Sequence, residues 1–271
     1  MHRSRSVVRS PVTISTMVQN KYLKVTLRIL APLVFWIGLL WAVAAILNEP
    51  FLLPTPPAIL KALIALLGTK GFYVSVLFSL LRVLGGLGIG IVCGTALGLL
   101  VHFIPSLSVL IRPLLTVIRS TPVASVVILV WSFTGSKTLP FVIAALMVTP
   151  IVADELSTGL SNPDRPLEEM SDLFGFSPWR RFLTWKLPAA LPYFFGAITT
   201  SVGFAWKAGI AAEILAATFR SVGREIYQAK LYLEIDKLWA YTLTVVIFSV
   251  ILEFSVKKTL HYIERRTAWV R

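Results

Sequence analysis

Two charged side chains stand inside a long apolar segment of this sequence, where a charge is costly enough to suggest a role. Lys207 and Glu213 lie six residues apart in the run from 188 to 217. On a helix that spacing is about 240° around the axis, so the two do not form a simple pair on one face. The face of Lys207 also carries small or partly polar residues, namely Thr200, Gly203 and Ala211. This strip could attract an anionic solute; alternatively, the ammonium group extends to lipid headgroups.

A third basic residue, Arg119, comes shortly before a proline. Because Pro122 has no backbone N–H, it predicts a kinked helix with free carbonyl oxygens at this point. The guanidinium and these carbonyls could line the same path as the strip around Lys207. A role at a cytoplasmic interface is the alternative.

The sequence gives little support for metal binding, disulfide formation, ATP hydrolysis or other catalysis. The three histidines do not have metal-ligand spacing, and the single cysteine, Cys93, excludes an intramolecular disulfide and a cysteine metal cluster. No glycine-rich phosphate loop ending in Lys-Ser or Lys-Thr occurs, so the chain does not itself hydrolyse ATP. Glu213 and Glu253 have no evident catalytic partner. We therefore expect a protein that is not an enzyme and needs no metal or cofactor.

The composition identifies the solvent around these residues. The chain has 271 residues, of which 56% are hydrophobic and 14% charged, whereas a soluble domain has about 25% charged residues. The formal net charge is +13, but no basic stripe interleaves with aromatic residues, so we expect no nucleic-acid binding. We predict an all-α integral membrane protein in contact with the lipid bilayer.

Six apolar segments are long enough to be membrane spans, which need roughly 20 residues each. They cover about 30–47, 72–104, 113–133, 138–157, 188–217 and 237–260. Arg119 and Pro122 interrupt the third. The weaker block 51–67 is predicted to be a loop followed by a short amphipathic helix on the surface.

The distribution of Lys and Arg predicts the orientation of these spans. With the N-terminus inside, sixteen of the 26 basic residues fall on the cytoplasmic side and seven outside, and three lie in or beside spans. Both termini are thus expected to be cytoplasmic, with residues 1–28 as a basic tail and 29–271 as one membrane domain. Cleavage of a signal peptide at "AVA" (42–44) is the alternative, but the apolar run around that site is longer than a typical signal peptide's.

The loop between the fourth and fifth spans, about 158–187, is too elaborate for a plain connection. It predicts two short helices at a corner, with Asp164 as a possible first cap, Gly175 as the stop of the first helix and Ser177-Pro178 as the start of the second. Leu167, Met170 and Phe174 fall at helical spacing and form an apolar face. Two interpretations stay open: the loop docks into another protein, or it lies on the membrane with Arg180, Arg181 and Lys186 at the headgroups.

A row of glycines recurs every four residues in the second span, at Gly86, Gly90, Gly94 and Gly98. Such a stripe lets two helix backbones approach closely in lipid. It fits packing inside one subunit and a contact between subunits equally well.

The loop resembles the cytoplasmic signature of permease subunits of bacterial ATP-binding-cassette importers. That signature reads Glu-Ala-Ala, three residues, Gly, nine residues, Ile, one residue, Leu-Pro. This chain keeps the spacing at Glu169, Met170, Ser171, Gly175, Trp185, Leu187 and Pro188. Met-Ser replaces Ala-Ala and Trp replaces Ile. The run "WKAGIAAEIL" at 206–215 is similar to the nitrate, sulfonate and taurine class of these permeases, and the likeness spans about 30–265.

The resemblance implies a six-span permease of the type I importer fold in a bacterial inner membrane. The loop would be the coupling element for a cytosolic ATPase subunit, through Glu168, Glu169, Met170, Phe174, Gly175, Leu187 and Pro188. Further implied partners are an extracytoplasmic solute-binding protein and a second permease subunit in a homodimer. The solute would be small, for example an organic anion such as a sulfonate. An ion-coupled secondary transporter or channel is the alternative.

Overall fold

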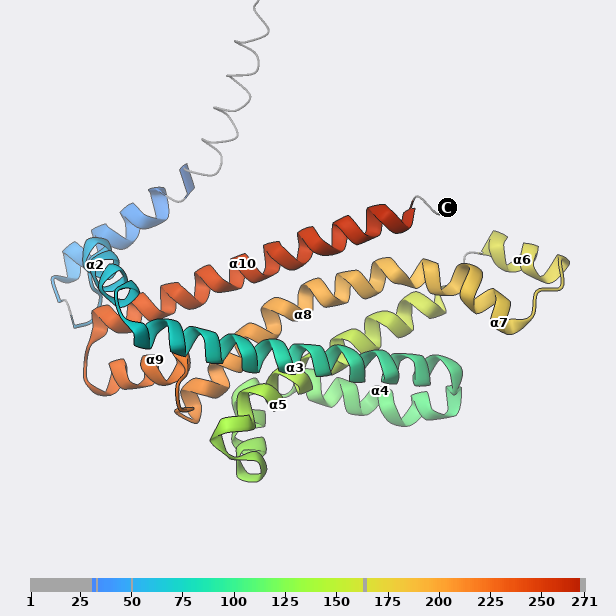
Figure 1. Ribbon diagram of the computed structural model, residues 1–271, viewed down its shortest axis with the longest axis horizontal. Helices are drawn as coiled ribbons and strands as arrows, with labels where there is room; N and C mark the ends of the chain where they lie inside the picture. Colours follow the sequence, from blue (N-terminus) through green and yellow to red (C-terminus); the bar gives the residue numbers. More distant parts are fainter. Residues whose placement is uncertain (1–30, 33, 50, 163–164, 269–271) are drawn as a thin grey trace, which may run out of the picture. The chain divides into compact units, whose positions relative to one another are not determined.

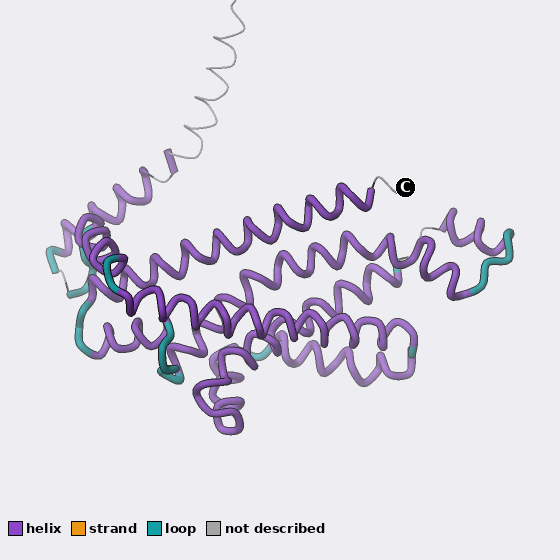
Figure 2. Tube along the Cα trace, viewed as in Figure 1, coloured by secondary structure: helices purple, strands orange, loops and turns teal. Residues whose placement is uncertain are grey.

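The computed structural model describes residues 31–32, 34–49, 51–162 and 165–268. The basic tail 1–28 and the expected cap Asp164 lie outside these residues. The chain divides into two compact units, 1–60 and 61–271. Every described element is a helix or a loop (Figure 2).

The first unit contains a short apolar helix, Val34–Leu47, within the expected first span. The elements that follow are α2 (Pro56–Leu67), α3 (Lys70–Phe103), α4 (Pro105–Ser120), α5 (Val123–Ser161), α6 (Arg165–Leu173), α7 (Pro178–Arg181), the π-helical turn η1 (Phe182–Lys186), α8 (Leu187–Leu215), α9 (Val222–Leu231) and α10 (Ile235–Ala268). Four helical stretches among the described residues are long and apolar enough to cross a membrane: Lys70–Phe103, Val123–Ser161, Pro178–Leu215 and Ile235–Glu264.

The interruption expected at Arg119 and Pro122 in the third span, 113–133, is a full break between two helices. α4 ends at Ser120, Thr121 is extended with φ −76° and ψ 132°, and α5 begins after Pro122. The cause is local, since a residue before proline is driven out of the α region and proline itself cannot continue the hydrogen-bond ladder. A second break follows at Gly135, whose φ of 71° and ψ of 163° are not helical. The expected fourth span lies in the part of α5 after this break.

α5 is the central helix of the second unit, and α3 and α8 both pack against it (Figure 1). The stripe Gly86, Gly90, Gly94 and Gly98 is buried at the α3–α5 contact. A Cβ added to Gly86 would lie 2.3 Å from the carbonyl oxygen of Phe141, and one added to Gly90 would lie 2.7 Å from Cβ of Val148. The stripe therefore packs within one subunit, which decides between the two uses that the sequence left open.

Candidate functional site

The loop between α5 and α8 folds into a tight corner, which consists of α6, α7 and the turn between them (residues 165–181). Two residues after the end of α6 the backbone takes a positive φ, 63° at Gly175. The N–H of Gly175 donates to the carbonyl of Asp172 (3.1 Å), and the N–H of Phe176 donates to that of Ser171 (2.9 Å). These two bonds form a Schellman motif, which caps the last carbonyls of a helix. The predicted helix stop at Gly175 is confirmed.

The second helix of the corner, α7, starts at Ser177 and Pro178, as the sequence predicts. The Ser177 side chain caps α7 by accepting a hydrogen bond from the N–H of Arg180 (3.3 Å), and Pro178 takes the first helical position. α7 passes through η1 into α8 without leaving the helical region, so Leu187 and Pro188 form the first turn of α8. Any displacement of α7 is thus passed directly to α8.

A clamp that the sequence analysis missed holds the two sides of the corner together. Arg181, on α7, forms an ion pair with Asp172, on α6, at 2.5 Å. Its Nε also donates to the carbonyl of Phe176 (2.9 Å). The assignment of Arg181 to lipid headgroups, part of the membrane-surface interpretation, is therefore wrong, because both arms of its guanidinium point back into the corner. The sequence did contain a signal for this ion pair, because Asp172 and Arg181 carry opposite charges on either side of the helix-stopping Gly175.

The corner presents an apolar surface to solvent. Leu173 and Phe174 are 87% and 73% exposed, and Met170 is exposed beside them. Leu167 is only half-buried rather than part of a fully exposed face, and Leu173 extends the face instead. Glu169 is exposed and Glu168 half-buried. Large apolar side chains held outward by a capped corner suit a partner surface.

The corner is anchored to the rest of the unit by aromatic side chains. Phe182 and Trp185 are buried, and Phe182 packs with Leu156 and Leu160 of α5 and with Ala190 of α8. Trp185 occupies the Ile position of the signature. The corner, the end of α5 and the start of α8 therefore form one packed body.

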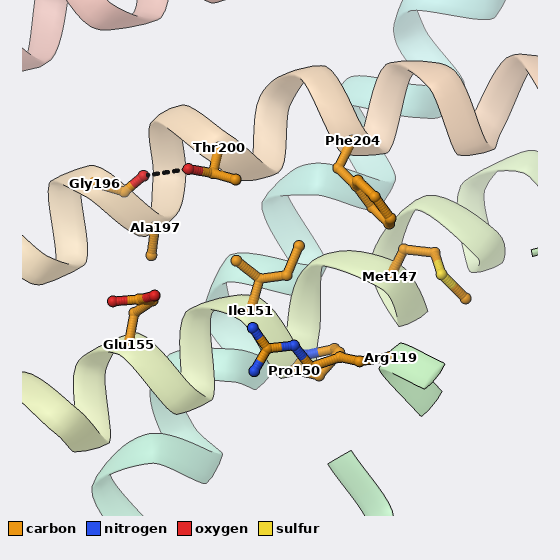
Figure 3. A pocket seen from close by; sticks show the side chains of 9 residues that line it. All are labelled: Arg119, Met147, Pro150, Ile151, Glu155, Gly196, Ala197, Thr200 and Phe204. Carbon is orange, nitrogen blue, oxygen red and sulfur yellow. Dashed lines mark hydrogen bonds between the residues drawn. The ribbon is translucent and has the colours of Figure 1, made fainter. Parts of the chain in front are cut away.

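A cavity of about 430 Å³ opens further along α5 and α8. Figure 3 shows Arg119 of α4 and Glu155 of α5 pointing into it, with Thr200 and Phe204 of α8 across the gap. Arg119 forms an ion pair with Asp154, the residue before Glu155. The cavity therefore contains the guanidinium of Arg119, whose charge is partly neutralised by Asp154, and the carboxylate of Glu155. Apolar walls surround these two groups.

The structure brings only part of the predicted path together. Arg119 and Thr200 line the cavity, whereas Pro122, Gly203 and Lys207 are not among its lining residues. Gly203 is buried against Glu253 of α10, since a Cβ there would lie 2.1 Å from the carboxylate. Lys207 is exposed on α8 and has no hydrogen bond or ion pair with the described residues.

Glu213 is fully buried and joins three helices. Its carboxylate accepts hydrogen bonds from Oγ of Ser79 (2.6 Å) and the N–H of Gly223 (3.3 Å), and Arg82 lies 3.5 Å away. Arg82 also donates to the carbonyl of Phe219 (2.9 Å). Glu213 therefore pairs with a basic residue of another helix, Arg82 of α3. Ser79 and Arg82 lie more than 130 positions away in the sequence, so spacing could not identify them.

Comparison with known proteins places this architecture in a family. The family model described as "Binding-protein-dependent transport system inner membrane component" matches residues 86–268. A probable ABC transporter permease protein of Haemophilus influenzae is 27% identical over 241 residues, covering 87% of this chain and 97% of the relative. The taurine transport system permease protein TauC of Escherichia coli is 25% identical over 227 residues, covering 80% of this chain and 81% of the relative.

The fold has solved counterparts as well. In the crystal structure of a bacterial alginate ABC transporter in complex with its pentasaccharide-bound periplasmic protein, one chain has a TM-score of 0.59 and 13% identity to this one. The alignment covers 94% of this chain and 98% of that one. The family model spans more than half of the chain and carries the corner, the cavity and α8. The protein therefore belongs to the binding-protein-dependent transport system inner membrane components, the multi-pass permease subunits of ABC importers, whose ATPase is a separate subunit.

Proposed function

We propose that the loop 158–187 is the element through which the ATPase subunit moves this permease. The observation that carries the proposal is the capped corner, which holds Met170, Leu173 and Phe174 outward. Glu169, exposed beside them, would meet a basic residue or a backbone donor of the ATPase. The apolar side chains would fill a cleft in that subunit, and Gly175 would set the angle between α6 and α7.

The corner is well placed to transmit motion. α5 runs into it, α8 runs out of it, and the buried Phe182 packs against both helices. The cavity at Arg119 lies between α4, α5 and α8. Nucleotide-driven closure of an ATPase pair needs only to bias two arrangements of these helices in order to open the pathway on one side or the other.

For the membrane arrangement we propose six crossings with both termini in the cytoplasm. α4 with the first part of α5 would make the third crossing, and α5 after Gly135 the fourth. The excess of basic residues on the side of the corner supports this orientation. A second copy of the chain would complete the pathway, and a solute-binding protein would deliver the solute on the opposite side.

For the solute we propose a small organic anion such as a sulfonate. Arg119 faces the cavity and could attract the anionic group, while Glu155 could hold an amino group of the same molecule. The taurine permease among the relatives supports this class, because taurine carries both groups. Arg119, Pro122, Thr200, Gly203 and Lys207 remain our candidates for the pathway, and we rank Arg119 and Thr200 first because they share the cavity.

The docking proposal is tested with two variants of the corner. Glu169→Lys would introduce repulsion and leave the partner's charge unpaired; breaking such a contact costs a few kcal/mol, or roughly a hundredfold in docking. Gly175→Val would remove the corner, because a β-branched residue is a strong outlier at positive φ. Asp236→Lys, the same type of charge change at the exposed start of α10, is the matched control.

The measurements are copurification of the ATPase subunit and ATP-dependent uptake in proteoliposomes. We expect both to fall in the two corner variants and to stay near wild type in the control, with all three proteins present in the membrane. Wild-type docking and uptake in both corner variants would show that the loop is not the coupling element.

A further inference from the structure

A single polar side-chain contact joins α4 to another helix within the described part of the chain. Arg119, in the last turn of α4, donates from Nη1 to Oδ2 of Asp154 on α5. The other hydrogen bonds from α4 side chains, those of Ser108, Thr116 and Ser120, go to backbone carbonyls of α4 itself. The ion pair therefore holds the end of α4 to α5, and we call it the clasp.

The apolar packing of α4 is sparse. Of its 16 residues only Leu115 is buried, and Ile118 packs against an apolar cluster of α5 and α8. The chain leaves the helical conformation directly after α4, at Thr121 and Pro122. A helix with so few buried side chains and a break at its end can move at small cost once the clasp opens.

The guanidinium of the clasp also faces the cavity. Arg119 and Glu155 line the cavity (Figure 3), whereas Asp154 is not among its lining residues. Nη1 of Arg119 donates to Asp154, while its remaining N–H groups have no acceptor among the described residues. The planar fork of an arginine suits a bidentate contact with an oxyanion. An anion in the cavity would therefore compete with Asp154 for the guanidinium.

The clasp is weak enough for such an exchange. The side chains of Arg119 and Asp154 are 41% and 51% exposed, and an ion pair in contact with water adds little stability. A fully buried pair would not open so readily, because separating it would leave a charge without water or a partner. Asp154, once released, can be hydrated.

Glu155 determines which anion can make the exchange. Together with Asp154 it gives this group of three side chains one negative charge in excess of the charge on Arg119. A simple anion increases that excess, and like charges at close range repel. A molecule that also carries an ammonium group leaves the net charge unchanged and can pair with Glu155.

We infer that an amino sulfonate opens the clasp: its sulfonate takes the guanidinium of Arg119, its ammonium group pairs with Glu155, and Asp154 releases the end of α4. The inference rests on the solute class of the proposed function. Asp154 is then a positioning residue, since it contacts Arg119 and not the solute. Glu155 is the residue that selects against anions without an amine.

The test measures the distance between α4 and α5 by pulsed electron paramagnetic resonance in the purified permease–ATPase complex. Spin labels are attached at two exposed positions, Ser120→Cys and Thr158→Cys, in a Cys93→Ala background. Complexes labelled at one position only identify the distances between two subunits. The variants are Asp154→Asn, the charge-conserving Asp154→Glu, and Glu155→Gln, which removes the neighbouring carboxylate but keeps the clasp. The probes are taurine and ethanesulfonate, which has the same sulfonate but no amine.

Without solute we expect a short distance in wild type, Asp154→Glu and Glu155→Gln, and a longer one in Asp154→Asn. Taurine should lengthen the distance in wild type, whereas ethanesulfonate should do so only in Glu155→Gln. Coupling between solute binding and the clasp is reciprocal. Asp154→Asn should therefore bind taurine more tightly than wild type in calorimetric titrations, by up to about fivefold for a partly exposed pair.

The outcomes separate this inference from the proposed function. Taurine that binds wild type without changing the distance would overturn the clasp and leave the solute class standing. If taurine does not bind, both the clasp and the solute class are refuted. An unchanged distance in Asp154→Asn would show that the ion pair does not hold α4, and equal responses of wild type to the two sulfonates would refute selection by Glu155.

Discussion

Because α3 and α5 approach each other closely, we predict that a single added methyl group destabilises the protein at Gly86 but not at Gly88. Gly86→Ala places a Cβ 2.3 Å from the carbonyl oxygen of Phe141 and 2.8 Å from Cβ of Ala144, two atoms of α5 that lie on or next to its backbone. Gly88→Ala, half a turn away on the same helix, places its Cβ where nothing lies within 4 Å. The same chemical change is therefore made once inside the helix contact and once outside it.

The magnitude follows from this geometry. Non-bonded carbon atoms prefer separations of about 3.5 Å or more, so the helices would have to part by roughly 1 Å at Gly86. Forcing an extra methyl group into a packed core costs about 1–3 kcal/mol. The gain in helix propensity from Gly to Ala, up to about 1 kcal/mol, is shared by both variants and cancels in the comparison.

The assay is thermal unfolding of the purified permease complex, together with the amount of protein recovered from membranes. At about 2–4 °C per kcal/mol for a chain of this size, Gly86→Ala should unfold roughly 2–12 °C below Gly88→Ala. Gly88→Ala should equal wild type or exceed it slightly. If the two variants have the same midpoint and the same yield, the stripe is permissive and α3 does not depend on its glycines to pack on α5.

Three further changes test other contacts. Asp172→Asn removes the ion pair to Arg181 but keeps the bond to the Phe176 carbonyl, and because the pair is partly exposed it should reduce ATPase copurification only a fewfold, at about 1 kcal/mol or less; complete loss would mean that the ion pair alone holds the corner. A cysteine at position 161 (Ser161→Cys in a Cys93→Ala background) should react with a membrane-impermeant thiol reagent only after permeabilisation, and labelling in intact cells would reverse the proposed orientation. Glu213→Gln should lower the thermal midpoint by the equivalent of about 1–3 kcal/mol, since it turns an amide N–H₂ toward buried donors; an unchanged midpoint would show that these bonds do not stabilise the fold.

What the sequence predicted well was governed by local rules. The stop at Gly175, the cap at Ser177 and the break at Pro122 each depend on the backbone preferences of one or two residues, and the structure has all three. The apolar segments that became α3, α8 and α10 followed from length and composition alone. Hydropathy alone would draw the third segment as one helix, because it averages over the break that the proline rule predicts at Pro122.

What the sequence could not predict depends on contacts between distant residues. The partners of Glu213 are Ser79 and Arg82 on another helix, and only the packing of α3 on α8 brings them together. Likewise, the glycine spacing predicts a close helix contact but does not say that α5 is the partner. Lys207 and Gly203 share a helix face with Thr200, yet α10 covers Gly203 and leaves Thr200 at the cavity.

The distances along the helices indicate how a push on the corner would reach the cavity. Glu155 lies six residues before the end of α5 and Gly196 nine residues after the start of α8, or roughly 9 Å and 14 Å at 1.5 Å per residue. Pro192 lies between the corner and Gly196 on α8, and Pro150 lines the cavity on α5. Each proline removes one backbone hydrogen bond, so bending costs least at these points. A rotation of the packed corner would therefore be absorbed by bending within the few turns of α5 and α8 nearest the corner, and this bending would move the cavity walls. The glycine-packed α3–α5 contact would keep the movement from propagating further. The proposed coupling would need no long chain of contacts, because the corner and the cavity share the same two helices.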